Sequence, residues 1–275
     1  MILKDFKEMI NRVLFCAGSG MGIQTPYYDA YLQISYHERL VLAIRNDTLY
    51  YRLGIVSMAV EDDVFGICDN LEDSNWSEIG ITMNVSSLRE IARNQKAETV
   101  RFYNAGVGKG YFHVGTSRVL VENGLWGCNH YNDDEFVQLY TGNDELSQIL
   151  PCSFTVDRLS LLSALGMAST IIDSRFSCLL YLELSPGTLV LRTSDFDDSA
   201  KDEIACDYSG EETVLKFEIR YFSEIIDHID TERIGIRFCP GEVNAAILPV
   251  HPVEPEKAKY DYFFVLAQKI RWGGR

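Results

Sequence analysis

The chain has 275 residues and a formal net charge of −15 at pH 7, with 47% hydrophobic and 24% charged residues. This composition is typical of a globular protein, and the length is enough for one or two domains with cores of their own. No apolar run is long enough to span a membrane and the first residues lack a signal-peptide core, so we expect a cytoplasmic protein with no membrane partner.

The charge and the cysteines restrict the classes of function. A strongly acidic protein is not expected to bind nucleic acid, because phosphates require a basic surface, unless its 25 Lys and Arg residues gather on one face. The seven cysteines are odd in number and include no Cys-x-x-Cys pair, which argues against a zinc site or a disulfide framework.

The first part of the chain predicts two helices and several strands. A helix is expected from Leu3 to Leu14, with Lys4, Lys7 and Arg12 off its apolar stripe. A glycine-rich loop at 16–26 follows; it lacks the G-x-G-x-x-G spacing and follows a helix, so it is interpreted as a flexible connection. Further predicted elements are a hairpin at 31–53, a strand region at 56–67, an acidic loop at 69–78, a helix from an N-cap at Asn84 to about 94–95, and strands at 100–103 and 110–121.

The second part predicts the same kinds of element after a weakly periodic stretch. Its best-defined helix carries an apolar stripe of Ile219, Phe222, Ile226 and Ile229 between two strands of alternating pattern. The other predictions are a helix at 156–165, a hairpin at 179–192, and strands at 243–248 and 262–266.

An internal repeat links the two parts. Residues 83–91 align with 217–225 without a gap, at an offset of 134, and the hairpin at 31–42 resembles that at 181–191, at an offset of about 150. A repeat this long predicts two similar domains and not a solenoid. We therefore predict domains at 1–125 and 151–275 joined by a connector at 126–150. Each is expected to be an α+β unit of antiparallel sheet with two helices on one face.

No catalytic constellation is found. The five histidines are scattered without a metal-ligand spacing, and no G-x-S-x-G elbow, Cys–His signature or H-E-x-x-H motif occurs. The sequence therefore predicts no catalytic residue, metal site or cofactor, and a protein that is not an enzyme.

The second domain resembles the C-terminal domain of the bacterial DNA polymerase III beta subunit, the sliding clamp. The resemblance rests on ordered motifs: Leu-Val-Leu-Arg-Thr-Ser-Asp at 189–195, Tyr-Ser-Gly-Glu at 208–211, the stretch 217–222, Glu-Arg-Ile-Gly-Ile at 232–236, and the closing strand at 262–270. The first domain resembles the same unit more faintly. The sequence departs from the family pattern at Glu218, where the family has Asn, and in the last strand, which ends Leu-Ala-Gln-Lys-Ile at 266–270.

This resemblance implies a DNA clamp fold and a processivity factor in DNA replication. Such a protein encircles double-stranded DNA without sequence preference and tethers its clients, among them a DNA polymerase and a clamp loader, through short peptide motifs. Clamps of this bacterial family have three domains per chain and close as dimers, whereas two-domain relatives close as trimers. The resemblance therefore implies a ring-shaped homotrimer with head-to-tail interfaces.

The resemblance also implies two sets of site residues. Because clamp helices line the central hole, basic helix residues would contact phosphates, and the candidates are Lys4, Lys7, Arg12, Arg89, Arg93, Lys96, Arg158 and Arg220. The groove for partner peptides is expected where the connector meets the last strand, at Leu150, Pro151, Phe264 and Leu266. Each of these residues can equally be an ordinary solvated or core position.

Two alternatives remain from the sequence. One is a clamp-derived interaction module that binds proteins without encircling DNA, which the few positive charges of the second domain favour. The other is an enzyme that binds a nucleotide through the glycine-rich loop.

Overall fold

A computed structural model gives the structure of the chain and describes its secondary structure in two compact units. The first unit comprises Met1–Thr141 and Ala258–Tyr262, and the second comprises Gly142–Lys257 and Phe263–Arg275. The residues that the structure describes are 2–17, 29–35, 39–46, 52–59, 78–94, 99–104, 109–114, 117–122, 143–170, 178–194, 199–242, 244–251 and 261–267.

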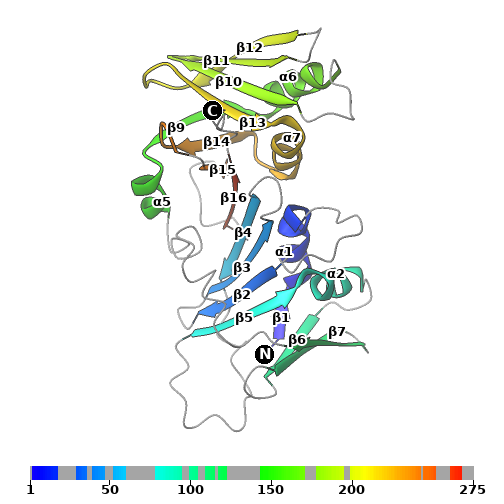
Figure 1. Cartoon of the computed structure of the whole chain (residues 1–275). Helices are drawn as coiled ribbons and strands as arrows, with labels where there is room; N and C mark the ends of the chain where they lie inside the picture. The colour runs from blue at the N-terminus through cyan, green and yellow to red at the C-terminus, as the bar shows by residue number, and fades with distance from the viewer. Residues whose placement is uncertain are drawn as a thin grey trace, which may run out of the picture. The chain divides into compact units, whose positions relative to one another are not determined.

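Apart from η1 in the first half and α5 at the start of the second, both halves follow the same order of elements: strand, helix, four strands, helix and three strands (Figure 1). In the first half the elements are β1 (Ile2–Lys4), α1 (Phe6–Val13), η1 (Leu14–Ala17), β2 (Asp29–Ser35), β3 (Arg39–Asn46), β4 (Arg52–Ala59), β5 (Glu78–Asn84), α2 (Val85–Arg93), β6 (Thr99–Asn104), β7 (Lys109–Val114) and β8 (Ser117–Glu122). In the second half they are α5 (Asn143–Ile149), β9 (Cys152–Asp157), α6 (Arg158–Thr170), β10 (Leu179–Ser185), β11 (Thr188–Ser194), β12 (Ser199–Asp207), β13 (Thr213–Glu218), α7 (Ile219–His228), β14 (Arg233–Phe238), β15 (Asn244–Val250) and β16 (Asp261–Ala267).

The strands pair antiparallel in the same order in each unit. The first unit contains β1-β6-β7-β8 and β5-β2-β3-β4, and the second contains β9-β14-β15-β16 and β13-β10-β11-β12. In the second unit β12 also pairs with β9, with Cys206 opposite Val156, which joins the two groups of strands.

Strand register confirms the repeat. Leu32 lies opposite Leu42 on one side and Ile81 on the other. In the second unit Leu182 lies in the same way between Leu191 and Leu215. Leu32, Leu42 and Ile81 therefore occupy the same register positions in the first unit as Leu182, Leu191 and Leu215 in the second, and a slip of one residue in either copy would break this match. The predicted α+β architecture of two repeated units is confirmed.

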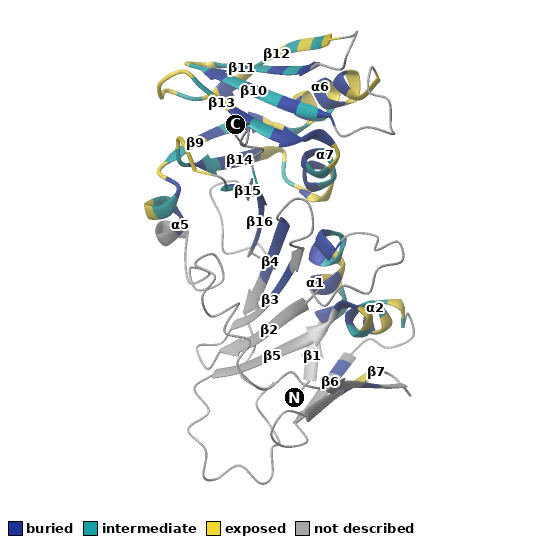
Figure 2. Ribbon diagram, viewed as in Figure 1, coloured by how far each residue is buried: buried dark blue, intermediate teal, exposed yellow. Residues whose placement is uncertain are grey.

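The helices of the second unit cover the apolar face of its sheet. On β10 buried positions alternate with half-buried ones (Figure 2). The buried residues are Leu180, Leu182 and Leu184, so these leucines point inward. Helix α7 packs on this face through Phe222, whose ring stacks on that of Phe217 with centroids 5.2 Å apart. Helix α6 lies beside α7. In the first unit α1 and α2 are neighbours in the same way.

Three details differ from the sequence predictions. The first helix begins at Phe6 and not at Leu3, because Ile2–Lys4 pairs with β6 as strand β1. Asp5 ends that strand in a left-handed conformation, with φ 59°. Helix α6 runs to Thr170, and a short helix, α5, lies inside the predicted connector. Most of the glycine-rich loop and the acidic loop lie outside the described residues.

Candidate nucleic-acid interface

We define the helix layer of each unit as its two neighbouring helices, α1 with α2 and α6 with α7. Six of the eight basic residues predicted to face DNA lie on these helices. Lys4 lies instead on strand β1, where its backbone pairs with Thr99. Lys96 is outside the described residues.

In the first unit, Lys7 and Arg12 make contacts whose geometry is defined. Lys7 on α1 donates a hydrogen bond from Nζ to the carbonyl oxygen of Asn94, directly after the last residue of α2. A cation at this end of a helix is favourable because the last carbonyls are unsatisfied and carry partial negative charge. The guanidinium of Arg12 lies over the ring of Tyr262, 4.8 Å from its centroid; Tyr262 belongs to the first unit, although residues 263–267 of the same strand belong to the second.

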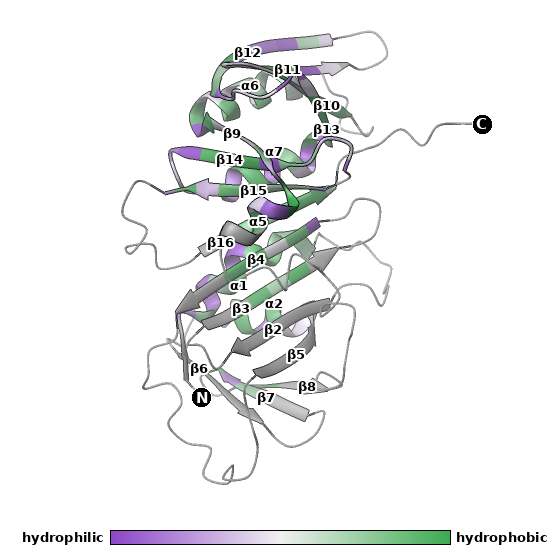
Figure 3. Ribbon diagram, turned by 90° about the vertical axis from the view of Figure 1, so that its left-hand side faces the viewer, coloured by the Kyte–Doolittle hydropathy of each residue, from purple (hydrophilic) through white to green (hydrophobic). Residues whose placement is uncertain are grey.

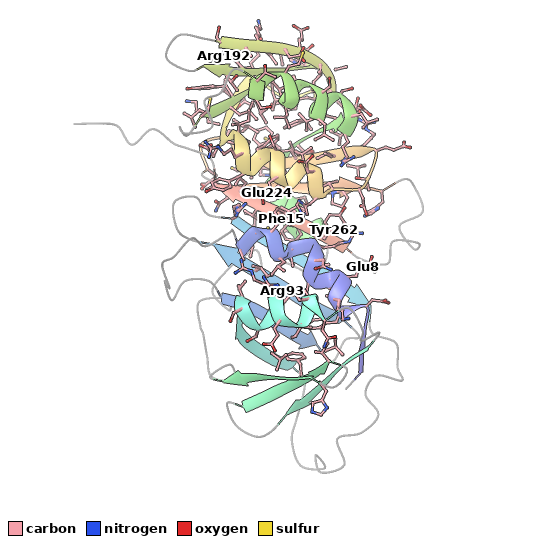
Figure 4. The ribbon with its side chains drawn as sticks, turned by 90° about the vertical axis from the view of Figure 1, so that its right-hand side faces the viewer. Glu8, Phe15, Arg93, Arg192, Glu224 and Tyr262 are labelled. Carbon is pink, nitrogen blue, oxygen red and sulfur yellow. The ribbon has the colours of Figure 1, made fainter. Side chains whose placement is uncertain are left out.

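The other two cations of this layer lie one turn apart on α2. Arg89 is half-buried and Arg93 is exposed, and Arg93 is labelled in Figure 4. Helices α1 and α2 also carry two exposed carboxylates, those of Glu8 and Glu90. Four cations against two carboxylates leave this helix layer with a net charge of +2.

In the second unit, Arg158 joins the two helices of the layer. It is the first residue of α6, and it donates from Nε to the carbonyl oxygen of Ile226 and from a terminal nitrogen to that of Asp227, both at 3.3 Å. These carbonyls belong to the last turn of α7. Arg158 and Lys7 thus make the same type of contact, from the first helix of a unit to the carboxyl end of the second.

The remaining surface of α6 is uncharged. After Arg158 the helix has no ionisable residue, and it exposes Leu159 and Met167, at 70% and 53% of their full areas. Figure 3 shows this helix mostly in the colour of hydrophobic residues. On α7, the exposed Arg220 is outnumbered by two carboxylates, Glu224 and Asp227, so this helix has a charge of −1 that Arg158 on α6 offsets. With His228 neutral, the helix layer of the second unit has no net charge.

The start of α6 is held by a carboxylate cap. Oδ1 of Asp157 accepts hydrogen bonds from the backbone N–H and the hydroxyl of Ser160, at 2.8 and 2.7 Å. The Ser160 hydroxyl and backbone hydrogen bonds, helped by the charge of Arg233, lower the pKa of Asp157 against the opposing effect of burial. This is an N-cap, which fixes the first turn of the helix.

The four residues predicted for the peptide groove differ in exposure. Leu150, Phe264 and Leu266 are fully buried, with at most 1% of their areas exposed, whereas Pro151 is exposed. Phe264 lies opposite Ile247 on β15, and Leu266 lies opposite Ala245, so both belong to rows of buried residues that cross the sheet. Their role in peptide binding stays a prediction.

The part of the chain that the structure describes meets the requirements of neither a metal site nor a membrane-spanning helix. Within it, no group of three or more His, Cys, Asp or Glu side chains could hold a metal ion. None of the described helices is long and apolar enough to cross a membrane.

Comparison with known proteins identifies the fold. Neither a protein-family model nor a curated protein sequence matches the chain. Among solved structures, the chain is similar to the pol III beta protein of Caulobacter crescentus, with a TM-score of 0.70 and 18% identity over 98% of this chain. The DNA polymerase III subunit beta of Pseudomonas aeruginosa gives 0.69 and 16%, and the beta subunit of Thermotoga maritima gives 0.70 and 15%, each again over 98% of the chain.

The chain therefore has the fold of the bacterial sliding clamps, as its sequence motifs predicted. It spans 65% of the length of each of these three structures.

Proposed function

We propose that the protein is a DNA sliding clamp, a non-enzymatic processivity factor that encircles duplex DNA and tethers replication proteins to it. The observation that carries this proposal is the fold: both units repeat one arrangement of strands and helices, and 98% of the chain superposes on sliding clamps. The protein would act in the cytoplasm, where its partners, a DNA polymerase and a clamp loader, meet DNA.

The proposed ring contains three copies of the chain. Two units per chain would then give six units around the hole, joined by head-to-tail interfaces that close. A ring holds DNA by topology, so it needs only weak contacts with the phosphates.

The charge distribution suggests how the DNA would be contacted. The helix layer of the first unit has a net charge of +2, whereas that of the second has none. We expect Arg93, which is exposed, and Arg89, one turn before it on α2, to supply most of the phosphate contacts because their charges lie close together on one helix. Lys7 and Arg158 would contribute less, because each already donates hydrogen bonds to a helix end.

Partner peptides would bind near Pro151, the exposed member of the predicted groove. The floor of this site would be formed by three buried side chains, those of Leu150, Phe264 and Leu266. A peptide that reached them would have to displace part of the second unit's core.

A second candidate is a clamp-derived module that binds proteins without encircling DNA. The observation that favours it is the neutral and partly apolar surface of α6, which offers no charge to a phosphate beyond Arg158.

The mass of the protein in solution separates these two candidates. Light scattering after size exclusion, over a dilution series, should give three times the 31.2 kDa of one chain if the ring forms. The mass of a single chain at every concentration would contradict the ring and support the interaction module.

A pair of charge-matched variants then tests the helix layer. The double variant Arg89→Gln with Arg93→Gln removes up to six cations from a trimeric ring. The slope of log binding constant against log salt concentration, measured with a short duplex, should therefore become shallower by at most about 5. The control, Lys201→Gln with Lys216→Gln, removes the same charge from a sheet surface and should leave the slope unchanged. Equal slopes for both variants would remove Arg89 and Arg93 from the DNA interface.

A further inference from the structure

The sheet of the second unit has an outward face, away from its helix layer, and this face carries a row of cations. Because residues alternate across a strand, the partners of the inward leucines point outward. Register places four of them side by side, one on each strand: Lys216 on β13, Tyr181 on β10, Arg192 on β11 and Lys201 on β12. We call these four residues the basic row.

Tyr181 organises the centre of the row. The Arg192 guanidinium lies over its ring, 4.5 Å from the centroid, and the Lys216 ammonium lies 5.7 Å from the same centroid. Arg192, labelled in Figure 4, also forms an ion pair with Glu183, 2.7 Å from Nε to Oε1. The guanidinium and the ring are therefore held in place by each other and by this carboxylate.

The two lysines have no such carboxylate. Among the described residues, neither Lys201 nor Lys216 forms an ion pair. With strands about 4.8 Å apart, their positions are separated by about 14 Å across the sheet. In a chain of net charge −15, two ammonium groups outside any ion pair, on either side of a fixed guanidinium, make this row locally positive.

The internal repeat shows that the fold does not require these cations. In the first unit Tyr31 occupies the position of Tyr181, but its row contains Thr82, Ala43 and Ile55. Ala43 and Ile55 are fully buried, whereas Lys201 is exposed and Lys216 half-buried. The positions of Arg192 and Lys201 are thus taken in the first copy by apolar residues that are fully buried.

The neighbouring row indicates which anion would fit. About 7 Å along the strands, Glu183 and Glu203 alternate with Val190 and Val214, and Val214 is 46% exposed. A nucleic acid is a continuous polyanion and would be repelled by Glu203, whereas Glu183 is already paired with Arg192. A peptide can place carboxylates over the basic row and an apolar side chain over Val214.

We propose that the basic row is a docking surface for an acidic, partly apolar peptide segment of a partner protein. An extended peptide of about four residues spans the 14 Å between the two lysines at about 3.3 Å per residue, so carboxylates at positions i and i+4 would reach both. This surface lies on the opposite face of the sheet from the helix layer, and its proposal does not depend on DNA binding or on ring formation.

Fluorescence anisotropy with a labelled peptide of alternating Glu and Leu tests the proposal directly. The full-length protein should bind this probe, and a peptide with Gln in place of Glu should not. Lys201→Gln with Lys216→Gln should weaken binding by at least tenfold, whereas Arg89→Gln with Arg93→Gln should leave it unchanged.

Three results would overturn the proposal. The first is that the protein does not bind the acidic peptide at low salt. The second is that both double variants bind this peptide equally well. The third is that the protein binds a single-stranded oligothymidine more tightly than the peptide and that the lysine variant loses this binding. The last result would make the row a nucleic-acid surface. Both variants change surface charge alone, so circular dichroism should show that each keeps the native fold.

Discussion

Removal of the Asp157 carboxylate should destabilise α6 by an amount that depends on pH. In Asp157→Ala the backbone N–H and hydroxyl of Ser160 lose their acceptor, which lies 2.8 and 2.7 Å away. Loss of an N-cap costs about 1 kcal/mol, within a range of about 0.5 to 2 kcal/mol. Asp157→Asn keeps an acceptor oxygen of equal capping strength and removes only the charge, so it is the matched control.

The sign of the pH effect follows from the direction of the pKa shift. The hydrogen bonds from Ser160 lower the pKa of Asp157 in the folded protein below its ordinary value of 3.8. Stabilisation by such a group is fully present above the unfolded pKa and is lost as the pH falls through the folded pKa. The difference in unfolding free energy between wild type and Asp157→Ala should therefore be constant near neutral pH and should shrink below about pH 3.8.

Urea unfolding followed by circular dichroism measures this difference, and hydrogen exchange of the first turn of α6 shows that the effect is local. A wild-type urea midpoint in Asp157→Ala would refute the capping interpretation. So would a difference that grows as the pH falls. If Asp157→Asn is as unstable as Asp157→Ala at pH 7, the charge near the helix end, and not the acceptor geometry, provides the stabilisation.

Two further predictions concern the second unit. Gly166→Ala should stabilise the protein by about 0.5–1 kcal/mol, because Gly166 lies inside α6 with open space around it. Gly187→Ala should destabilise the protein, because Gly187 has φ +78° in the turn between β10 and β11. Opposite shifts of the urea midpoint are expected, and shifts of the same sign would contradict this assignment. Phe222→Ala should cost about 3–5 kcal/mol, because the side chain is fully buried and stacked on Phe217. Val214→Ala, at an exposed position, should change stability by less than about 0.5 kcal/mol, and similar losses in the two variants would mean that Phe222 is not part of the core.

The sequence predicted the elements whose signal is local. The stripe of Ile219, Phe222 and Ile226 identified α7 because its spacing of three and four is complete within one helix. The predicted start of α1 was wrong because the spacing of Leu3 and Phe6 fits one continuous helix as well as a short strand followed by a helix. The turn at Asp5 that separates them depends on its left-handed backbone, which the residue type does not reveal.

The candidate site could be predicted only in part, because its details depend on residues far apart in the chain. The basic residues of the helices were found, but the use of Lys7 and Arg158 at helix ends was not. Their carbonyl partners lie 87 residues away for Lys7, and 68 and 69 residues away for Arg158. The basic row was missed for a related reason: Tyr181, Arg192, Lys201 and Lys216 become neighbours only through the register of four strands.

The shared register of the two units has a consequence for how the protein can be recombined. The β2–β3 and β10–β11 hairpins pair with their neighbours in matching positions, and the buried residues Leu42 and Leu191, at equivalent positions, are aliphatic in both. A hairpin exchanged between the copies would keep its inward side chains inward and would bring its own outward side chains with it. The exchange is therefore asymmetric. A β2–β3 hairpin in the second unit would replace Arg192 by alanine, whereas a β10–β11 hairpin in the first unit would bring Arg192 to the fully buried position of Ala43.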